Sequence, residues 1–171
     1  MPRCKRIAKP GIIMHTSRMT TFDDTDRRLL SALQSDSNRS AEDLSRDLGL
    51  SPSQIGRRRH RLETAGAIEG YRARLSARAL GLDVQAFVQV QLTTHDPERV
   101  KSLLRIFRTR PEIVSAWTLT GEADYLLRVF CADLAGLNTL LHQTLLPHPV
   151  VARVQSQIVM DQLKSDAPLP V

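Results

Sequence analysis

Residues 49–63 of the chain read GLSPSQIGRRRHRLE, and this stretch holds the clearest helix boundary in the sequence. Ser51 is a preferred capping residue, Pro52 suits the first turn of a helix, and Gln54 completes a capping box with Ser51. Gly49, just before them, supplies the left-handed conformation that a sharp turn needs. The stretch therefore predicts a capped helix that follows a tight turn.

Two shorter helices are predicted upstream of this one, and each has its own capping signal. Asp23 can cap the first helix, and Ser40 opens a capping box with Asp43 at the start of the second. The third helix continues to about Ala65, and Gly66 ends it. The first two helices carry leucines on one face, namely Leu29, Leu30, Leu33, Leu44 and Leu48. This order predicts a helix-turn-helix, whose third helix enters the major groove of DNA.

The third predicted helix carries a local net charge of +3, because four arginines between positions 57 and 61 outnumber Glu63. Arginines on a helix are most often simply solvated, and four in five positions cannot all face one way. Ile55, Arg59 and Leu62 share a face that should be core, so Arg59 either packs its stem or pairs with a carboxylate. The other three arginines are therefore the better candidates for DNA contact.

A short ribbon is predicted after the third helix, over residues 68–75, as the wing of a winged helix-turn-helix. The ribbon would bring Arg72 and Arg74 next to the third helix. Side chains at the N-terminal turn of such a helix reach phosphates and base edges. The residues expected to bind DNA are Ser51, Ser53, Gln54, Arg57, Arg58, His60, Arg61, Arg72 and Arg74.

The net charge of +6 is a weak argument for nucleic acid, because its distribution is uneven. Residues 1–19 contribute +5, residues 20–80 contribute +2 and residues 81–171 contribute −1. We expect residues 1–21 to form a disordered basic tail, either an arm that tracks DNA or an extension of no consequence. Aromatic residues, at 4%, are too few for stacking platforms on single-stranded nucleic acid.

Composition excludes other classes of protein. No apolar run approaches the roughly 20 residues of a membrane-spanning helix. Cys4 and Cys131 lie too far apart to form a disulfide framework or a zinc site, which favours a reducing cytoplasm. The five histidines show neither metal-ligand spacing nor a histidine–carboxylate constellation. We therefore expect no metal, no cofactor and no enzymatic activity.

A second domain is predicted from residue 84 onward, since apolar side chains alternate along residues 84–92 as in a half-buried strand. Asp96 and Asp133 can each cap a helix. Strands are expected at 84–92, 113–119, 125–131 and 150–160, with one helix after the first strand and one after the third. This β-α-β-β-α-β order is that of a ferredoxin-like domain, and it makes the fold class α+β.

Right-handed crossovers place both helices of such a domain on one face of its sheet. The other face stays open although it carries Phe87 and other apolar groups, so we expect a homodimer through that face. The expected boundaries are 22–76 for the winged helix-turn-helix, 77–83 for a linker, 84–164 for the ferredoxin-like domain and 165–171 for a frayed tail.

Five short segments, in this order and at this spacing, resemble the Lrp/AsnC family of bacterial and archaeal transcription regulators over about residues 22–164. The segments are FDDTDRRLLSALQ at 22–34, LSP at 50–52, RRHRLE at 58–63, GAIEGY at 66–71 and GEADY at 121–125. One position departs from the family pattern: residue 59 is usually apolar in the family, and here it is Arg.

The resemblance implies operator DNA as a partner of the N-terminal domain, and dimers that assemble into tetramers or octamers. It also implies a small effector, commonly an amino acid, that binds between neighbouring C-terminal domains and changes assembly or DNA affinity. A carboxylate at Asp124 would suit an ammonium group, although Gly-x-x-Asp is also an ordinary hairpin turn. The residues that match the effector region are Gly121, Asp124, Tyr125, Leu134, Gln157, Ile158 and Val159.

Two alternatives to an effector-gated regulator are an architectural DNA-binding protein without an effector and an enzyme. Siroheme decarboxylases resemble the family in fold but carry an Arg-Pro-Phe stretch and an Arg-Arg-Ile-Gly run. The matching places read RSA at 39–41 and IEGY at 68–71, so neither signature is present.

Overall fold

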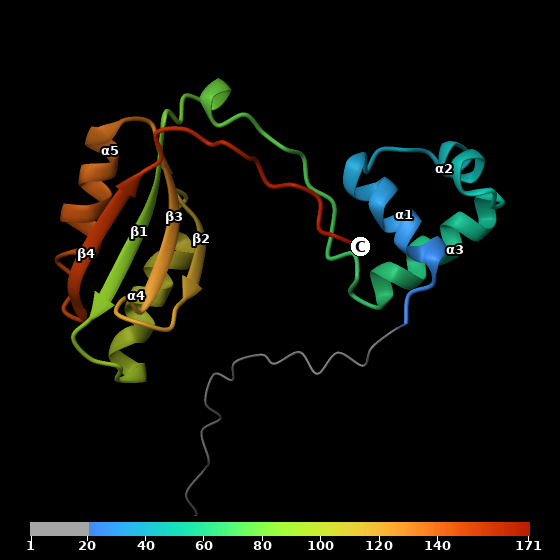
Figure 1. Ribbon diagram of the computed structural model, residues 1–171. Helices are drawn as coiled ribbons and strands as arrows, with labels where there is room; N and C mark the ends of the chain where they lie inside the picture. The colour runs from blue at the N-terminus through green and yellow to red at the C-terminus, as the bar shows by residue number, and fades with distance from the viewer. Residues whose placement is uncertain (1–20) are drawn as a thin grey trace, which may run out of the picture. The chain divides into compact units, whose positions relative to one another are not determined.

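The computed structural model describes residues 21–171. The predicted basic tail, except for its last residue, therefore lies outside the described residues. Two compact units make up the described chain (Figure 1). The helical unit contains the residues up to Arg72 together with Asp166–Val171, and the sheet unit contains Ala73–Ser165. These bounds differ from the expected domains, because the helical unit takes in the C-terminal segment that was expected to be frayed.

The helices of the helical unit are α1 (Asp24–Ser35), α2 (Ala41–Leu48) and α3 (Pro52–Thr64). Their starts confirm the predicted caps, since the side chains of Asp23, Ser40 and Ser51 each accept a backbone N–H from the first turn. The capping box at Ser51 is complete, whereas Asp43 accepts a hydrogen bond from the hydroxyl of Ser40 (2.7 Å). Gly49 adopts the predicted left-handed conformation, with φ of 69°.

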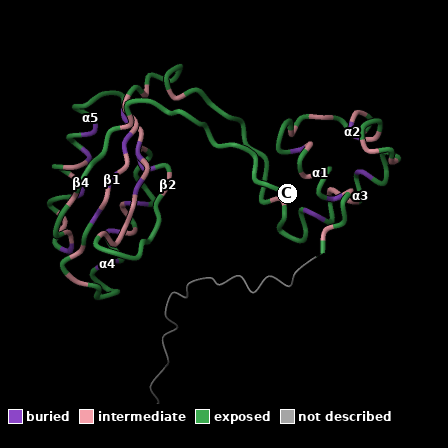
Figure 2. Tube along the Cα trace, in the orientation of Figure 1, coloured by how far each residue is buried: buried purple, intermediate pink, exposed green. Residues whose placement is uncertain are grey.

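The core of the helical unit draws on all three helices. Its buried apolar side chains are Leu29, Leu33, Leu44, Ile55 and Leu62. Figure 2 shows buried, half-buried and exposed positions along the helices of this unit. Each such side chain contributes about 1.5–3 kcal/mol through removal of apolar surface from water. This core fixes the inner face of α3, so the opposite face of α3 is free to meet a partner.

The sheet unit contains η1 (Arg78–Leu80), β1 (Val84–Leu92), α4 (Pro97–Thr109), β2 (Ile113–Thr118), β3 (Tyr125–Cys131), α5 (Leu134–Thr139), the π-helix η2 (Leu140–Leu145) and β4 (Val151–Ile158). Its strands form one antiparallel sheet in the order β2-β3-β1-β4. This element order and strand order confirm the ferredoxin-like prediction.

Both helices of the sheet unit pack on one face of the sheet, as expected. Val88 and Val90 of β1 are fully buried and belong to the same core as Leu103 of α4 and Leu137 of α5. Phe87 lies between the buried Ala86 and Val88 in the strand, so its side chain belongs to the opposite face. That face carries no helix of the sheet unit.

Two sequence predictions about strands are wrong. Residues 69–76 form neither helix nor strand and are exposed, and within the described residues no strand pairs with them to make the predicted wing. The last strand ends at Ile158, where its pairing with Ala86 ends, so Met160 lies outside it and is 99% exposed.

Candidate DNA-binding and effector sites

The solvent-facing side of α3 carries Ser53, Arg57 and His60, which follow the i, i+4, i+7 spacing of one helix face and are all exposed. Gly56 lies beside them, and a Cβ built there meets nothing within 4 Å. A helical glycine destabilises a helix by about 0.5–1 kcal/mol relative to alanine. The sequence analysis did not single out Gly56, although a glycine inside a well-capped helix is visible in the sequence.

The N-terminal turn of α3 holds its polar side chains in a fixed arrangement. The backbone N–H of Ser51 donates to Oε1 of Gln54 (2.8 Å), and the hydroxyls of Ser51 and Ser53 lie 3.1 Å apart. The carboxamide oxygen of Gln54 is therefore used by the cap, which leaves the NH2 group of the same side chain as the donor that DNA could accept. The cap orients the residues that were predicted to contact DNA.

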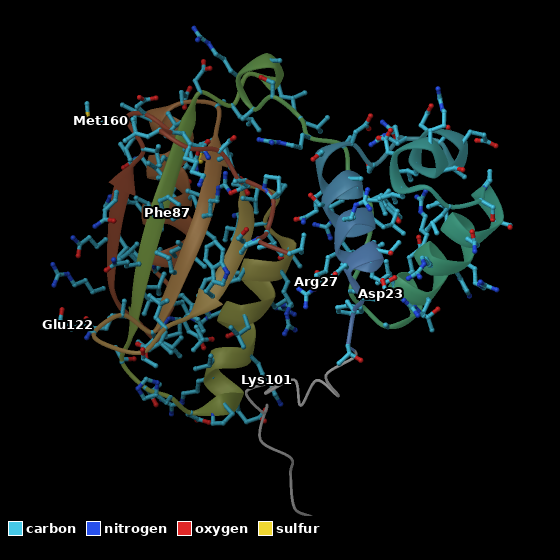
Figure 3. The ribbon with its side chains drawn as sticks, turned by 45° about the vertical axis from the view of Figure 1, so that its right-hand side comes forward. Asp23, Arg27, Phe87, Lys101, Glu122 and Met160 are labelled. Atoms are coloured by element: carbon cyan, nitrogen blue, oxygen red, sulfur yellow. The ribbon has the colours of Figure 1, made fainter. Side chains whose placement is uncertain are left out.

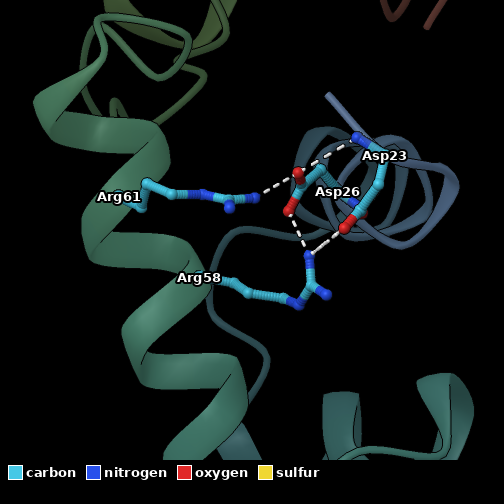
Figure 4. Close-up of polar contacts among 4 residues, drawn as sticks. All are labelled: Asp23, Asp26, Arg58 and Arg61. Carbon is cyan, nitrogen blue, oxygen red and sulfur yellow. Dashed lines mark hydrogen bonds and ion pairs between the residues drawn. The ribbon is translucent and has the colours of Figure 1, made fainter. Parts of the chain in front are cut away.

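A buried carboxylate joins the start of α1 to the middle of α3 (Figure 4). Asp26 is fully buried, and its carboxylate accepts a hydrogen bond from Nη1 of Arg58 (2.7 Å) and another from Nη2 of Arg61. Nη1 of Arg58 also donates to both carboxylate oxygens of Asp23, at 2.7 and 3.0 Å. The guanidinium groups of Arg58 and Arg61 thus have structural partners inside the helical unit, which the sequence analysis did not foresee.

The same contacts change the pKa of Asp23. The hydrogen bond from Arg58, followed by the one from the backbone of Asp26, lowers the pKa of Asp23 below its usual 3.8. Because the folded-state pKa lies below the unfolded one, the contribution of Asp23 to stability is complete above about pH 4 and decreases as the pH falls through the folded value. The α1–α3 junction is therefore sensitive to strong acid.

Arg59 pairs with a carboxylate, which is one of the two arrangements expected for it. Its Nε lies 3.3 Å from Oε1 of Glu63 and donates to the hydroxyl of Tyr71 (2.8 Å). The Tyr71 hydroxyl in turn donates to Glu63 (2.9 Å), and the Arg59 guanidinium carbon lies 4.5 Å from the centroid of the Tyr71 ring. Burial raises the pKa of Tyr71. This triad ties the segment after α3 to the helix in place of a wing, next to the exposed Arg72.

The residues that match the effector region fall into two groups. Gly121, Asp124 and Tyr125 lie at the β2–β3 turn and the start of β3, where Asp124 accepts the backbone N–H of Leu92 (2.8 Å). The other carboxylate oxygen of Asp124 lies 3.5 Å from Nδ1 of His95. The second group consists of Leu134 at the start of α5 together with Gln157, Ile158 and Val159 at the end of β4.

The two groups lie at opposite ends of the sheet. Tyr125 is paired with Val90, whereas Ile158 is paired with Ala86, four residues earlier along β1. Four residues of strand span about 13 Å. Figure 3 shows the same separation, with Glu122 at one end of the sheet and Met160 beyond the other. A single sheet unit therefore does not bring the two groups into one site.

The open face of the sheet is hollowed near the β2–β3 turn. The lining residues are Gln89, Gln91, Glu122, Ala123, Arg153 and Gln155. Apart from Ala123, all of them carry polar side chains, so the hollow favours a hydrogen-bonding partner. Elsewhere on this face lie apolar groups, among them Phe87 of β1 and Trp117 of β2, which is 45% exposed.

Among the described residues, no group of three or more histidine, cysteine, aspartate or glutamate side chains is placed to hold a metal ion. None of the described helices is long and apolar enough to cross a membrane.

Two family models match the chain. The AsnC-type helix-turn-helix domain matches residues 22–63, and the Lrp/AsnC ligand binding domain matches residues 85–169. The first match covers the capped helices and the second covers the sheet with its C-terminal segment.

Named relatives match over most of their length. The Bkd operon transcriptional regulator of Pseudomonas aeruginosa is 35% identical over 153 residues, which cover 88% of this chain and 100% of the relative. The leucine-responsive regulatory protein of Haemophilus influenzae is 33% identical over 151 residues, covering 88% of this chain and 91% of the relative. A transcriptional regulator from Neisseria meningitidis, solved in complex with L-Met, is 35% identical with a TM-score of 0.83, covering 88% of this chain and 97% of that chain.

Proposed function

Since the chain belongs to the Lrp/AsnC family of transcriptional regulators, we propose that it binds operator DNA through α3 as a homodimer whose DNA affinity is set by an amino acid. The helix-turn-helix domain and the ligand-binding domain make it an effector-modulated DNA-binding regulator, and members of this family are not enzymes. DNA as the partner also favours a cytoplasmic location. The observation that carries the DNA proposal is the exposed face of α3 that bears Ser53, Arg57 and His60. The opposite face of the helix is held in the core of the helical unit.

Within that stripe, we infer that Arg57 is the main arginine for DNA. Its side chain is exposed on the face where Gly56 permits close approach, whereas Arg58 and Arg61 are bound to Asp26. Arginine is the side chain best suited to a bidentate contact with guanine or to a phosphate. Arg72 and Arg74, which lie after α3 on exposed irregular chain, are assigned to backbone phosphates.

Arg57→Ala is expected to weaken binding to the DNA upstream of the protein's own gene by about tenfold to a hundredfold, as loss of one such contact does. Stability should be unchanged, because Arg57 is exposed. Electrophoretic mobility shift across a salt series measures both the affinity and its salt dependence. Arg105→Ala, an exposed arginine on α4, is the matched control. Equal losses for both variants would contradict a specific role for Arg57.

The homodimer is proposed to form through the open face of the sheet. Phe87 lies on that face in the middle of β1. Trp117 of β2, which is paired with Leu126 of β3, lies on the same face, and so does Phe130 of β3, which is paired with Gln85. A two-fold axis would pair the face with itself, bury the aromatic side chains and leave the glutamines to hydrogen-bond. Further association of dimers into tetramers or octamers is part of the proposal.

The effector is proposed to bind where two copies meet, because one sheet unit separates the two groups of effector-region residues by the length of β1. One copy would supply the Gly121–Tyr125 turn, and another would supply Leu134 and the end of β4. The Asp124 oxygen that faces His95 remains for an ammonium group, and Leu134, which is 59% exposed, offers apolar surface to a side chain. This arrangement would link effector binding to assembly.

At least one of the twenty amino acids, at 10 mM (about 100 times a 0.1 mM Kd), is expected to raise the melting temperature, since such a ligand stabilises the native state by about 2.7 kcal/mol. Differential scanning fluorimetry measures the shift, with the D-enantiomer as the ligand control. Gln157→Ala should reduce the shift, and Gln162→Ala, beyond the end of β4, should not. If no amino acid changes the melting temperature, the architectural alternative without an effector is favoured.

A further inference from the structure

The C-terminal segment returns to the DNA-binding part of the molecule. Asp166–Val171 groups with the helical unit, although the preceding residues, Ala73–Ser165, form the sheet unit. The two units are therefore joined by the chain twice, once after Arg72 and again after Ser165.

One side chain of α1 holds the returning segment by its backbone. Nε2 of Gln34 donates to the carbonyl oxygen of Leu169 (3.1 Å), and the N–H of Leu169 donates to Oε1 of Gln34 (2.7 Å). A carboxamide that pairs with both backbone groups of one residue makes the same two bonds that a neighbouring strand would make. The contact recognises an extended backbone and is indifferent to the side chain of Leu169, which is 73% exposed.

The sequence of the segment suits this mode of recognition. Residues 166–171 read DAPLPV, so Leu169 lies between two prolines. Pro168 and Pro170 have no N–H, and a residue before proline is restricted to extended conformations. Leu169 is thus held extended before it docks, with one donor and one acceptor to offer. This restriction lowers the entropy that docking would otherwise lose.

We propose that Asp166–Val171 is a strap that docks on α1 of its own chain through Gln34 and limits the freedom of the DNA-binding unit. The seven residues 159–165 connect this strap to the end of β4. The proposed function places part of the effector site at the end of β4. The strap therefore connects that site to α1 through a short stretch of chain and the hydrogen bonds of Gln34. Gln34, which belongs to the family-like segment at 22–34, acquires a role that DNA contact does not explain.

Cross-linking tests the docking without DNA or effector. In a Cys4→Ser background that keeps Gln34, the pair Ser31→Cys and Leu169→Cys should react with a short bis-maleimide to give an internally cross-linked monomer on a denaturing gel, because Ser31 is exposed three residues before Gln34 on α1. The pair Asp24→Cys and Leu169→Cys is the control, since seven residues of α1 separate position 24 from position 31 by about 10 Å. Cys131 is buried and stays in both. Equal yields for the two pairs, or cross-links only between chains, would overturn the proposal.

The effect on DNA binding tests the restraint. Gln34→Ala is expected to weaken operator binding by about threefold to tenfold, because a freer DNA-binding unit has a lower effective concentration at the second half-site. Gln34→Glu keeps the acceptor and loses the donor, so its loss should be smaller. Asn38→Ala removes an exposed carboxamide elsewhere in the helical unit and should change nothing.

Truncation after Ser165 separates the strap from other roles of Gln34. The truncated protein should bind DNA as weakly as Gln34→Ala, and combining the two changes should add no further loss, since both remove the same contact. Additive losses would overturn the restraint. If the cross-link forms but the unaltered protein does not bind operator DNA, the proposed function is wrong and the docking of the strap is still supported.

Discussion

Asp26→Ala is expected to lower the free energy of unfolding of the helical unit by about 3 kcal/mol, the lower end of the range for breaking a buried ion pair. The carboxylate of Asp26 is fully buried and bound to Arg58 and Arg61, so its loss removes the ion pair of Arg61 and leaves Arg58 with Asp23 alone. The side chain of Arg61 is 55% exposed and can be solvated, which keeps the loss from being larger.

A loss of this size is a large part of what holds so small a unit together, because stability amounts to about 0.05–0.15 kcal/mol per residue. Urea unfolding followed by circular dichroism at 222 nm measures it. Asp24→Ala is the matched control, since Asp24 is an exposed aspartate in the same first turn of α1. Operator binding should fall in parallel, because the cluster fixes α3. If both variants unfold at the same urea concentration, the Asp26 cluster contributes nothing to stability.

Local signals in the sequence predicted the helices well. The caps at Asp23, Ser40 and Ser51 depend on side chains within three residues of each helix start, so a short window contains all the information. The alternation of residues 84–92 likewise depends only on the period of a strand, and β1 has those bounds. The element order predicted a ferredoxin-like domain with both helices on one face of the sheet, because few topologies satisfy right-handed crossovers.

Contacts between distant residues were not predictable in the same way. Arg58 and Asp26 are 32 residues apart, and nothing in a local pattern says that a basic residue on α3 meets a carboxylate on α1. The segment at 68–75 alternates like a strand, but a strand requires a partner that the sequence does not display. Leu169 and Gln34 are 135 residues apart, so no local pattern indicates that they meet. The two prolines beside Leu169 are also typical of a frayed end, which is what the sequence predicted.

Position 59, where the sequence departs from the family pattern, is accommodated by contacts at the surface of the helical unit. The apolar residue usual in the family would pack against the helical core, whereas Arg59 reaches Glu63 and stacks on Tyr71. The charge of Arg59 is paired at the surface with the carboxylate of Glu63. The inner face of α3 therefore still has Ile55 and Leu62 buried on either side of it. The substitution changes the attachment of the segment after α3 and leaves the packing of the helix intact.

The proposed dimer leads to the other large expected effect. Phe87→Asp should convert the protein to a monomer at micromolar concentration, because two-fold symmetry brings the substituted position into the interface from both copies. Phe87 is only half-buried in the isolated chain and lies among glutamines on the open face, so the substitution leaves the core of the sheet unit intact. Light scattering should give the mass of one chain, 19.2 kDa. Leu80→Asp adds the same charge at an exposed leucine outside the sheet and is the control.

DNA binding distinguishes a broken interface from a damaged fold. A monomer loses the gain of binding two half-sites at once, so operator affinity should fall about a hundredfold or more while binding to a single half-site is retained. Trp117→Arg provides a second route to the monomer, since the side chain of Trp117 is 45% exposed on the same face and its loss spares β1. A wild-type circular dichroism spectrum for either variant shows that the sheet is formed. If both variants scatter light as dimers, the two-fold contact lies elsewhere, and the effector site cannot be completed across this face.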